Sequence, residues 1–169
     1  MTDEVRTGVA SALALLATPA PQRGDWVEAE PAFADLGESD VEEFVHDVAD
    51  TLDLTDEELV VALILLEAVL RRAGRASAPA DRACSLFLAA AVLAYKSLID
   101  FELGLCALSK ALAILGYDVS ARRLARMERL ALKALDHRVD VDAETLETYM
   151  AAVREEGRRV SERPRGEEA

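Results

Sequence analysis

The chain has few aromatic residues and little positive charge. Aromatic side chains make up 5% of its 169 residues, whereas alanine and leucine abound. This balance favours closely packed helices over a sheet, because strands are typically rich in β-branched and aromatic residues. Lys and Arg number 19 against 32 Asp and Glu, which gives a net charge of -13. Such a charge opposes binding to nucleic-acid phosphates or to anionic lipid, so we expect a protein partner, with no nucleic acid and no membrane.

Cysteine is also scarce, and its placement indicates no redox or metal chemistry. Cys84 and Cys106 both lie in apolar stretches, with no histidine pattern nearby. Neither a zinc site nor a disulfide framework is predicted, and we expect both thiols to pack in the core. No metal and no cofactor is expected.

Long apolar runs are missing as well. The longest uncharged run in the body of the chain, residues 83–95, is well short of the about 20 residues that a membrane span needs. Residues 9–17 resemble the core of a secretion signal, but Asp3 and Glu4 precede them where such signals are positively charged. We therefore expect an intracellular protein of the cytoplasm or nucleus.

The pattern along the chain predicts an all-α protein with one domain and flanking segments. Residues 18–25 contain two prolines and a glycine and cannot continue a helix. The predicted parts are an N-terminal extension with one possible helix (1–38), a five-helix domain (39–138), a C-terminal flanking helix (139–157) and a disordered tail (158–169).

Helix boundaries follow from capping residues and glycines. Ser39 and Thr55 each open a capping-box pattern, and Gly74 and Gly116 lie where a left-handed residue ends a helix. Asp100 and Asp142 can cap the fourth helix of the domain and the flanking helix. The domain helices are predicted at 40–52, 55–73, 79–99, 101–115 and 120–135, and the flanking helix at 142–154.

The third of these helices, 79–99, is the predicted centre of the bundle. Its apolar residues point in every direction around the helix axis, which is typical of a fully buried helix. The small residues Ala89, Ala90 and Ala91 allow neighbouring helices to approach closely.

The fifth helix separates into two faces. One face is a core-facing stripe and the other is basic. Glu128 falls within the apolar arc, about 40° from Leu124 and about 20° from Leu135. An unpaired charge there costs several kcal/mol, so we expect a cation nearby, and Lys96 near the end of the central helix is the candidate. The apolar stripe is Leu124, Met127, Ala131 and Leu135, and the basic stripe is Arg122, Arg126, Arg129 and Lys133.

Two segments resemble elements of the cyclin box, a five-helix domain that binds protein kinases. Residues 93–100 (LAYKSLID) look like the Ala-Ser-Lys-type end of the central small-residue helix. Residues 126–135 (RMERLALKAL) look like the Leu/Met-Glu step of the fifth helix. The resemblance covers roughly residues 39–138, and without a second box the chain is most similar to single-box cyclins of the phosphate-responsive and Y-type groups.

The resemblance implies a function. In the family, the residues corresponding to Lys96 and Glu128 bind main-chain groups of the kinase beside its mobile C helix. The chain is then expected to bind the catalytic subunit of a cyclin-dependent-type kinase and to activate it by positioning that helix. The expected apolar surround is Leu98, Ile99 and Phe101, with Asp100 and Glu102 remaining from the acidic cluster that usually follows the lysine.

Two alternatives stay open. One is a helical adaptor with a cyclin fold that binds something other than a kinase, as transcription-factor relatives of the fold do. The other is an enzyme, which we do not expect, because neither His46 nor His137 has a sequence-linked nucleophile and no Gly-rich phosphate loop or paired-acid motif is present. Ser161, after two arginines and a valine, matches a short phosphorylation motif for basophilic kinases on the predicted tail.

Overall fold

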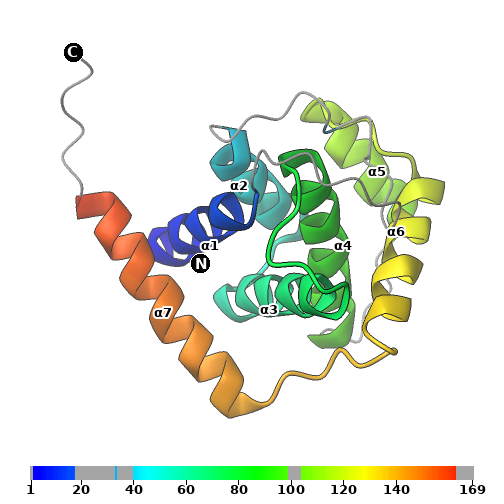
Figure 1. The fold of residues 1–169 in the computed structure, drawn as a ribbon. Helices are drawn as coiled ribbons and strands as arrows, with labels where there is room; N and C mark the ends of the chain where they lie inside the picture. The colour runs from blue at the N-terminus through cyan, green and yellow to red at the C-terminus, as the bar shows by residue number, and fades with distance from the viewer. Residues whose placement is uncertain (1, 18–32, 34–39, 99–103, 163–169) are drawn as a thin grey trace.

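The described part of the chain is all-helical, as predicted. The computed structural model describes residues 2–17, 33, 40–98 and 104–162, which form seven α-helices and no β-strand (Figure 1). A single isolated bridge joins Ala17 to Ala78. The helices are α1 (Asp3–Leu16), α2 (Val41–Leu52), α3 (Asp56–Arg72), α4 (Ala80–Leu98), α5 (Leu105–Ile114), α6 (Ala121–Ala134) and α7 (Ala143–Glu162).

Local capping chemistry sets several helix ends where the sequence predicts them. The Thr55 hydroxyl accepts a hydrogen bond from the Glu58 amide at 3.2 Å, and the Glu58 carboxylate accepts one from the Thr55 amide at 2.7 Å. Asp142 caps α7 by accepting from the Thr145 amide at 2.8 Å. Gly74 and Gly116 have φ angles of 68° and 95°, the left-handed conformation that ends a helix. The proposed caps Ser39 and Asp100 lie outside the described residues.

Helix α4 forms the centre of the bundle, and this prediction is confirmed. Ala89, Ala90 and Leu93 are each at most 4% exposed. The helix packs against α1, α2, α3 and α6, which lie on different sides of it (Figure 1). Small side chains along α4 explain why so many helices fit around one axis.

The two cysteines have different environments. Cys84 lies fully buried in α4, and burial raises the pKa of its thiol to about 12. Cys106 is exposed, so the prediction that both thiols pack in the core is wrong for this residue. The reason is that α5 buries only Leu108 and Leu112, a single narrow face, although the helix is apolar apart from Ser109 and Lys110.

Helix α7 is longer than the sequence indicates. It continues through Gly157 to Glu162, so the predicted end at Arg154 is wrong, and residues 158–162 are helical instead of belonging to a disordered tail. Gly157 does not end the helix, because it lies where α7 crosses α1. A Cβ atom on Gly157 would lie 1.9 Å from the Glu4 carbonyl oxygen, and one on Gly8 would lie 2.0 Å from the Val153 carbonyl oxygen.

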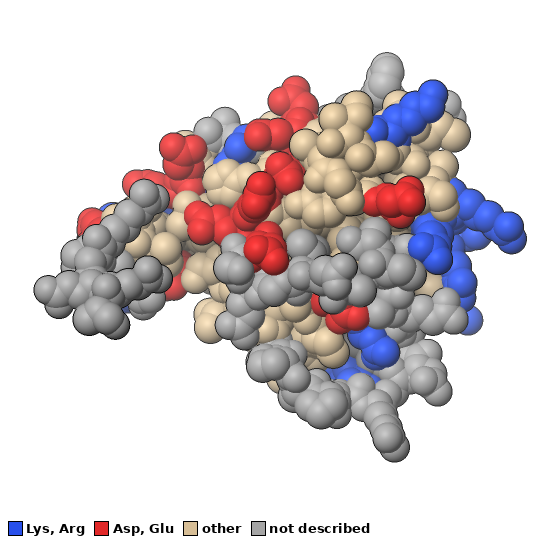
Figure 2. Space-filling view, turned by 90° about the horizontal axis from the view of Figure 1, so that it is seen from above, with Lys and Arg blue, Asp and Glu red and all other residues tan. Residues whose placement is uncertain are grey.

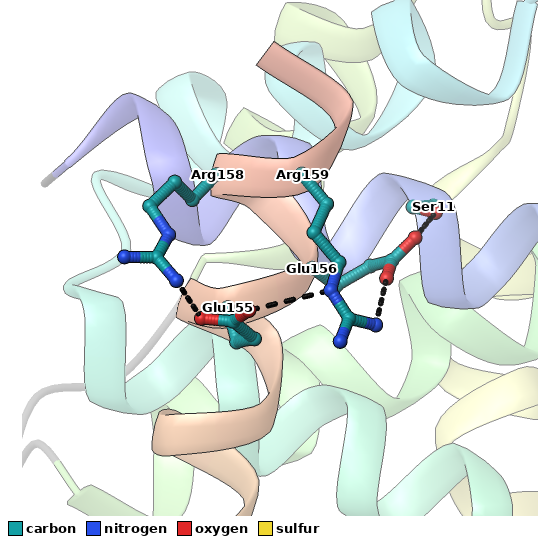
Figure 3. Close-up of polar contacts among 5 residues, drawn as sticks. All are labelled: Ser11, Glu155, Glu156, Arg158 and Arg159. Carbon is teal, nitrogen blue, oxygen red and sulfur yellow. Dashed lines mark hydrogen bonds and ion pairs between the residues drawn. The ribbon is translucent and has the colours of Figure 1, made fainter. Parts of the chain in front are cut away.

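Helix α1 is an integral part of this core. The helix expected within residues 1–38 is present, and its buried side chains Val5, Val9 and Leu13 join the common core. Polar contacts add to the packing on α7, where the Ser11 hydroxyl donates to Glu156 Oε1 at 3.1 Å (Figure 3). The first and last helices therefore hold each other against α2, α3 and α4.

Candidate functional site

Lys96 and Glu128 join α4 to α6. The Lys96 amine donates a hydrogen bond to Glu128 Oε1 at 2.7 Å, as the predicted pairing requires. The Lys96 side chain is 32% exposed and the Glu128 side chain 15%. Both charges thus lie partly out of water, where a close ion pair is screened less than one on an open surface.

Local structure puts each member of the pair in place. Lys96 lies in the last turn of α4, where a cation is favoured by the negative end of the helix dipole. Helix α6 begins at the Ser120 cap, whose hydroxyl accepts from the Arg123 amide at 3.4 Å. From that start, the helical period turns Leu124, Ala131 and Glu128 toward the rest of the bundle, with Leu124 and Ala131 buried.

The pair keeps unused hydrogen-bonding capacity. A lysine amine carries three N–H donors, and a carboxylate has two acceptor oxygens. Among the described residues, Glu128 Oε1 is the atom that Lys96 contacts, which leaves two donors and Oε2 for other groups. The arrangement suits a partner that presents both a carbonyl oxygen and an amide, such as exposed backbone.

The structure does not describe the side chains of the other predicted kinase-binding residues. Leu98 is the last residue of α4, but its side chain is not described. Ile99, Asp100 and Phe101 lie outside the described residues. The predicted apolar surround of the pair therefore stays a prediction.

Ser161, the predicted phosphorylation site, lies exposed in the last turn of α7. Its hydroxyl donates to the Gly157 carbonyl at 2.8 Å, and its phosphorylation stays a prediction.

The basic stripe of α6 faces solvent, as expected. Arg122, Arg126, Arg129 and Lys133 are all exposed. In Figure 2, basic side chains gather on the side where α6 lies, at the right in both views, and acidic side chains spread across the middle of the face. The molecule therefore has a positive edge despite its negative net charge.

Two polar contacts between segments far apart in the chain could not be predicted from the sequence. The Tyr117 hydroxyl donates to Asp47 Oδ2 at 2.8 Å, and the Tyr149 hydroxyl donates to Glu67 Oε2 at 2.6 Å. Burial raises the pKa of both phenols, and the acceptor carboxylates raise it further. No local pattern marks such pairs, since 70 and 82 residues separate their members.

Neither a membrane span nor a metal centre is found in the part of the chain that the structure describes. No described helix is both long and apolar enough to cross a bilayer. No three or more His, Cys, Asp and Glu side chains among the described residues are grouped so that they could hold a metal ion.

Comparison with known proteins adds no family assignment. No protein-family model, curated protein or solved structure matches the chain.

Proposed function

We propose that the chain is a cyclin-like regulatory subunit that binds the catalytic subunit of a cyclin-dependent-type protein kinase. The observation that supports the proposal is the Lys96–Glu128 ion pair, which joins the central small-residue helix to the helix carrying the Met-Glu step. The two segments that resemble the cyclin box contribute one member each. The pair retains donors and an acceptor for the backbone of a partner.

The proposed role is activation by positioning. A protein kinase is active when its strand-three lysine pairs with the glutamate of its C helix, and a regulator that contacts only the inward C helix stabilises that state. Moving such an equilibrium from 1:99 to 99:1 needs about 5.5 kcal/mol of differential binding. Two charge-assisted hydrogen bonds of about 1.5–3 kcal/mol each supply much of that difference, and apolar contacts around the pair supply the rest.

The direct experiment mixes the purified chain with purified monomeric cyclin-dependent-type catalytic subunits, one at a time. We expect one of them to form a stable complex in size-exclusion chromatography and to gain phosphotransfer activity toward a peptide substrate. The matched control is the same kinase with the Lys96→Ala/Glu128→Ala variant, which should neither bind as tightly nor activate. A panel in which no catalytic subunit binds or is activated would contradict the proposal.

A second function is favoured by a different reading of the same contact. Lys96 and Glu128 satisfy each other within the domain, so the pair needs no partner to avoid a buried unpaired charge. This suits a helical adaptor that shares the fold and binds a protein other than a kinase. Recovery of a non-kinase protein with the tagged chain from the source cell, and no kinase, would favour the adaptor.

A further inference from the structure

The outward side of α6 combines positive charge with one exposed apolar residue. We call it the α6 outer face and define it as Arg122, Arg126, Arg129, Leu130 and Lys133. All five are exposed, and Leu130 is 41% exposed. Leu130 lies four residues after Arg126 and three before Lys133, so on the helix surface it is a neighbour of both cations.

The charge on this face is not balanced within its own helix. The single acidic residue of α6 is Glu128, which points to the bundle and pairs with Lys96. Arg122, Arg129 and Lys133 form no ion pair with another described residue. Cations that follow one another at three- and four-residue spacing repel, which disfavours the helix. The stripe therefore weakens α6 in isolation, although acidic residues are plentiful elsewhere in the chain.

Leu130 distinguishes this face from an ordinary solvated one. Large apolar side chains are few on the exposed surface of the described residues, and Leu130 is the one set among cations. An apolar side chain surrounded by charged groups is the arrangement of a protein interface, in which an anchor is desolvated at the centre and charges remain at the rim.

We propose that the α6 outer face binds a short acidic segment of a partner protein, with an apolar side chain of that segment packing on Leu130 between carboxylates that meet the arginines and the lysine. The stripe from Arg122 to Lys133 is about 17 Å long, the length of three helical turns. A helical segment of about a dozen residues matches this length.

The length of the α6 outer face and the negative net charge of the chain favour a peptide over a nucleic acid as the partner. Duplex DNA carries a phosphate charge about every 1.7 Å along its axis and continues far beyond 17 Å. Beyond the stripe it would meet the surface of a chain with a net charge of -13. A short acidic segment covers only the α6 outer face and does not extend over the acidic surface beyond it.

The test measures binding of a labelled peptide to the full chain by fluorescence anisotropy. The probe is a fluorescein-labelled 12-residue peptide of Glu and Ala with one central Leu, and its Gln counterpart is the uncharged reference. We expect the acidic probe to bind at low salt and to lose about tenfold or more in affinity as salt is raised. The Gln peptide should not bind.

Variants distinguish binding at the α6 outer face from an effect of the overall charge of the protein. Replacing Arg122, Arg129 and Lys133 together by Gln should weaken binding about tenfold or more. The matched control replaces Arg154, Arg158 and Arg159 of α7 by Gln, which changes the net charge equally and should leave the affinity within about twofold. Leu130→Ala should weaken binding about threefold or more at every salt concentration, whereas Leu15→Ala, at an exposed leucine of α1, should not.

The inference is overturned by no binding of the acidic probe, by an equal loss in the α7 control, or by a Leu130→Ala variant that binds like the unchanged protein. Tighter binding of a DNA duplex of matched charge would also overturn it in favour of a nucleic acid. Lys96→Ala should leave probe binding unchanged, because the pair lies on the inner side of α6. A failed kinase experiment and a failed peptide experiment are therefore distinguishable.

Discussion

Gly157 of α7 lies against the backbone of Glu4 of α1, so close that a Cβ atom would fall 1.9 Å from the Glu4 carbonyl oxygen. The reciprocal contact places Gly8 of α1 against the Val153 carbonyl. Two glycines, one from each end of the chain, thus allow the first and last helices to cross at backbone distance. Glycine is required at both positions because a side chain there would collide with the backbone of the other helix. Neither glycine interrupts its own helix.

Gly157→Ala is therefore expected to destabilise the protein. Alanine favours a helix by about 0.8–1 kcal/mol over glycine, but the added methyl group forces the two backbones apart at a cost of about 1–3 kcal/mol or more. We expect a net fall in the free energy of unfolding, measured by urea denaturation. The control is Gly104→Ala, whose Cβ would meet its nearest neighbour, Ala107 Cβ, at an ordinary 3.8 Å. Equal stability of Gly157→Ala and the unchanged protein would show that α1 and α7 do not cross this closely.

Thr55→Ala should cost about 1 kcal/mol of unfolding free energy, because it removes the hydroxyl that accepts from the Glu58 amide. Thr51→Ala, inside α2, serves as the control and should stay within about 0.5 kcal/mol. Urea denaturation measures both. If the two variants lose equal stability, the capping box is not what stabilises the start of α3.

The two tyrosines that donate to carboxylates, Tyr117 and Tyr149, predict a loss of stability in alkali. Their pKa values are raised in the folded protein, so Tyr117 and Tyr149 keep their protons when an unfolded tyrosine, with a pKa near 10, has lost its own. Their contribution is complete below about pH 10 and is lost as the pH rises through the folded pKa values. In an absorbance titration, Tyr117 and Tyr149 should ionise only above about pH 10, together with the loss of helix. Ionisation of Tyr117 and Tyr149 near pH 10, with the helices intact, would contradict this account.

The sequence predicts what is set locally or by one helical face. The cap at Thr55, the left-handed glycines Gly74 and Gly116 and the buried position of α4 all follow from neighbouring residues. The Lys96–Glu128 contact could be predicted because a charge inside an apolar arc requires a partner, and the central helix offers a suitable cation.

What the sequence could not show depends on segments that meet only in the folded chain. Gly157 has the local pattern of a helix end, and its role appears only once α1 lies against it. Cys106 has an apolar sequence environment, but α5 sits at the margin of the bundle and leaves the thiol exposed. The sequence also does not indicate the hydrogen bond between Tyr117 and Asp47, because 70 residues separate them.

The most direct test of the proposed function is a double-mutant cycle on kinase affinity with Lys96→Ala, Glu128→Ala and both together, using the catalytic subunit that the chain activates. We expect each single variant to bind about ten- to a hundredfold more weakly, through loss of charge-assisted hydrogen bonds to kinase backbone. The double variant should lose less than the sum, because the two side chains act as one unit.

Thermal unfolding of the same variants completes the measurement, with Arg72→Ala as the control because it removes the ion pair between α3 and Asp136 without touching the proposed site. We expect Glu128→Ala to melt close to the unchanged protein, because the Lys96 side chain is 32% exposed and its amine regains water. Lys96→Ala should melt somewhat lower, because the Glu128 side chain that it leaves unpaired is only 15% exposed. Arg72→Ala should bind the kinase normally. If Lys96→Ala and Glu128→Ala instead bind and activate the kinase normally while melting many degrees lower, the pair only holds α4 to α6 and the proposed kinase-binding role is contradicted.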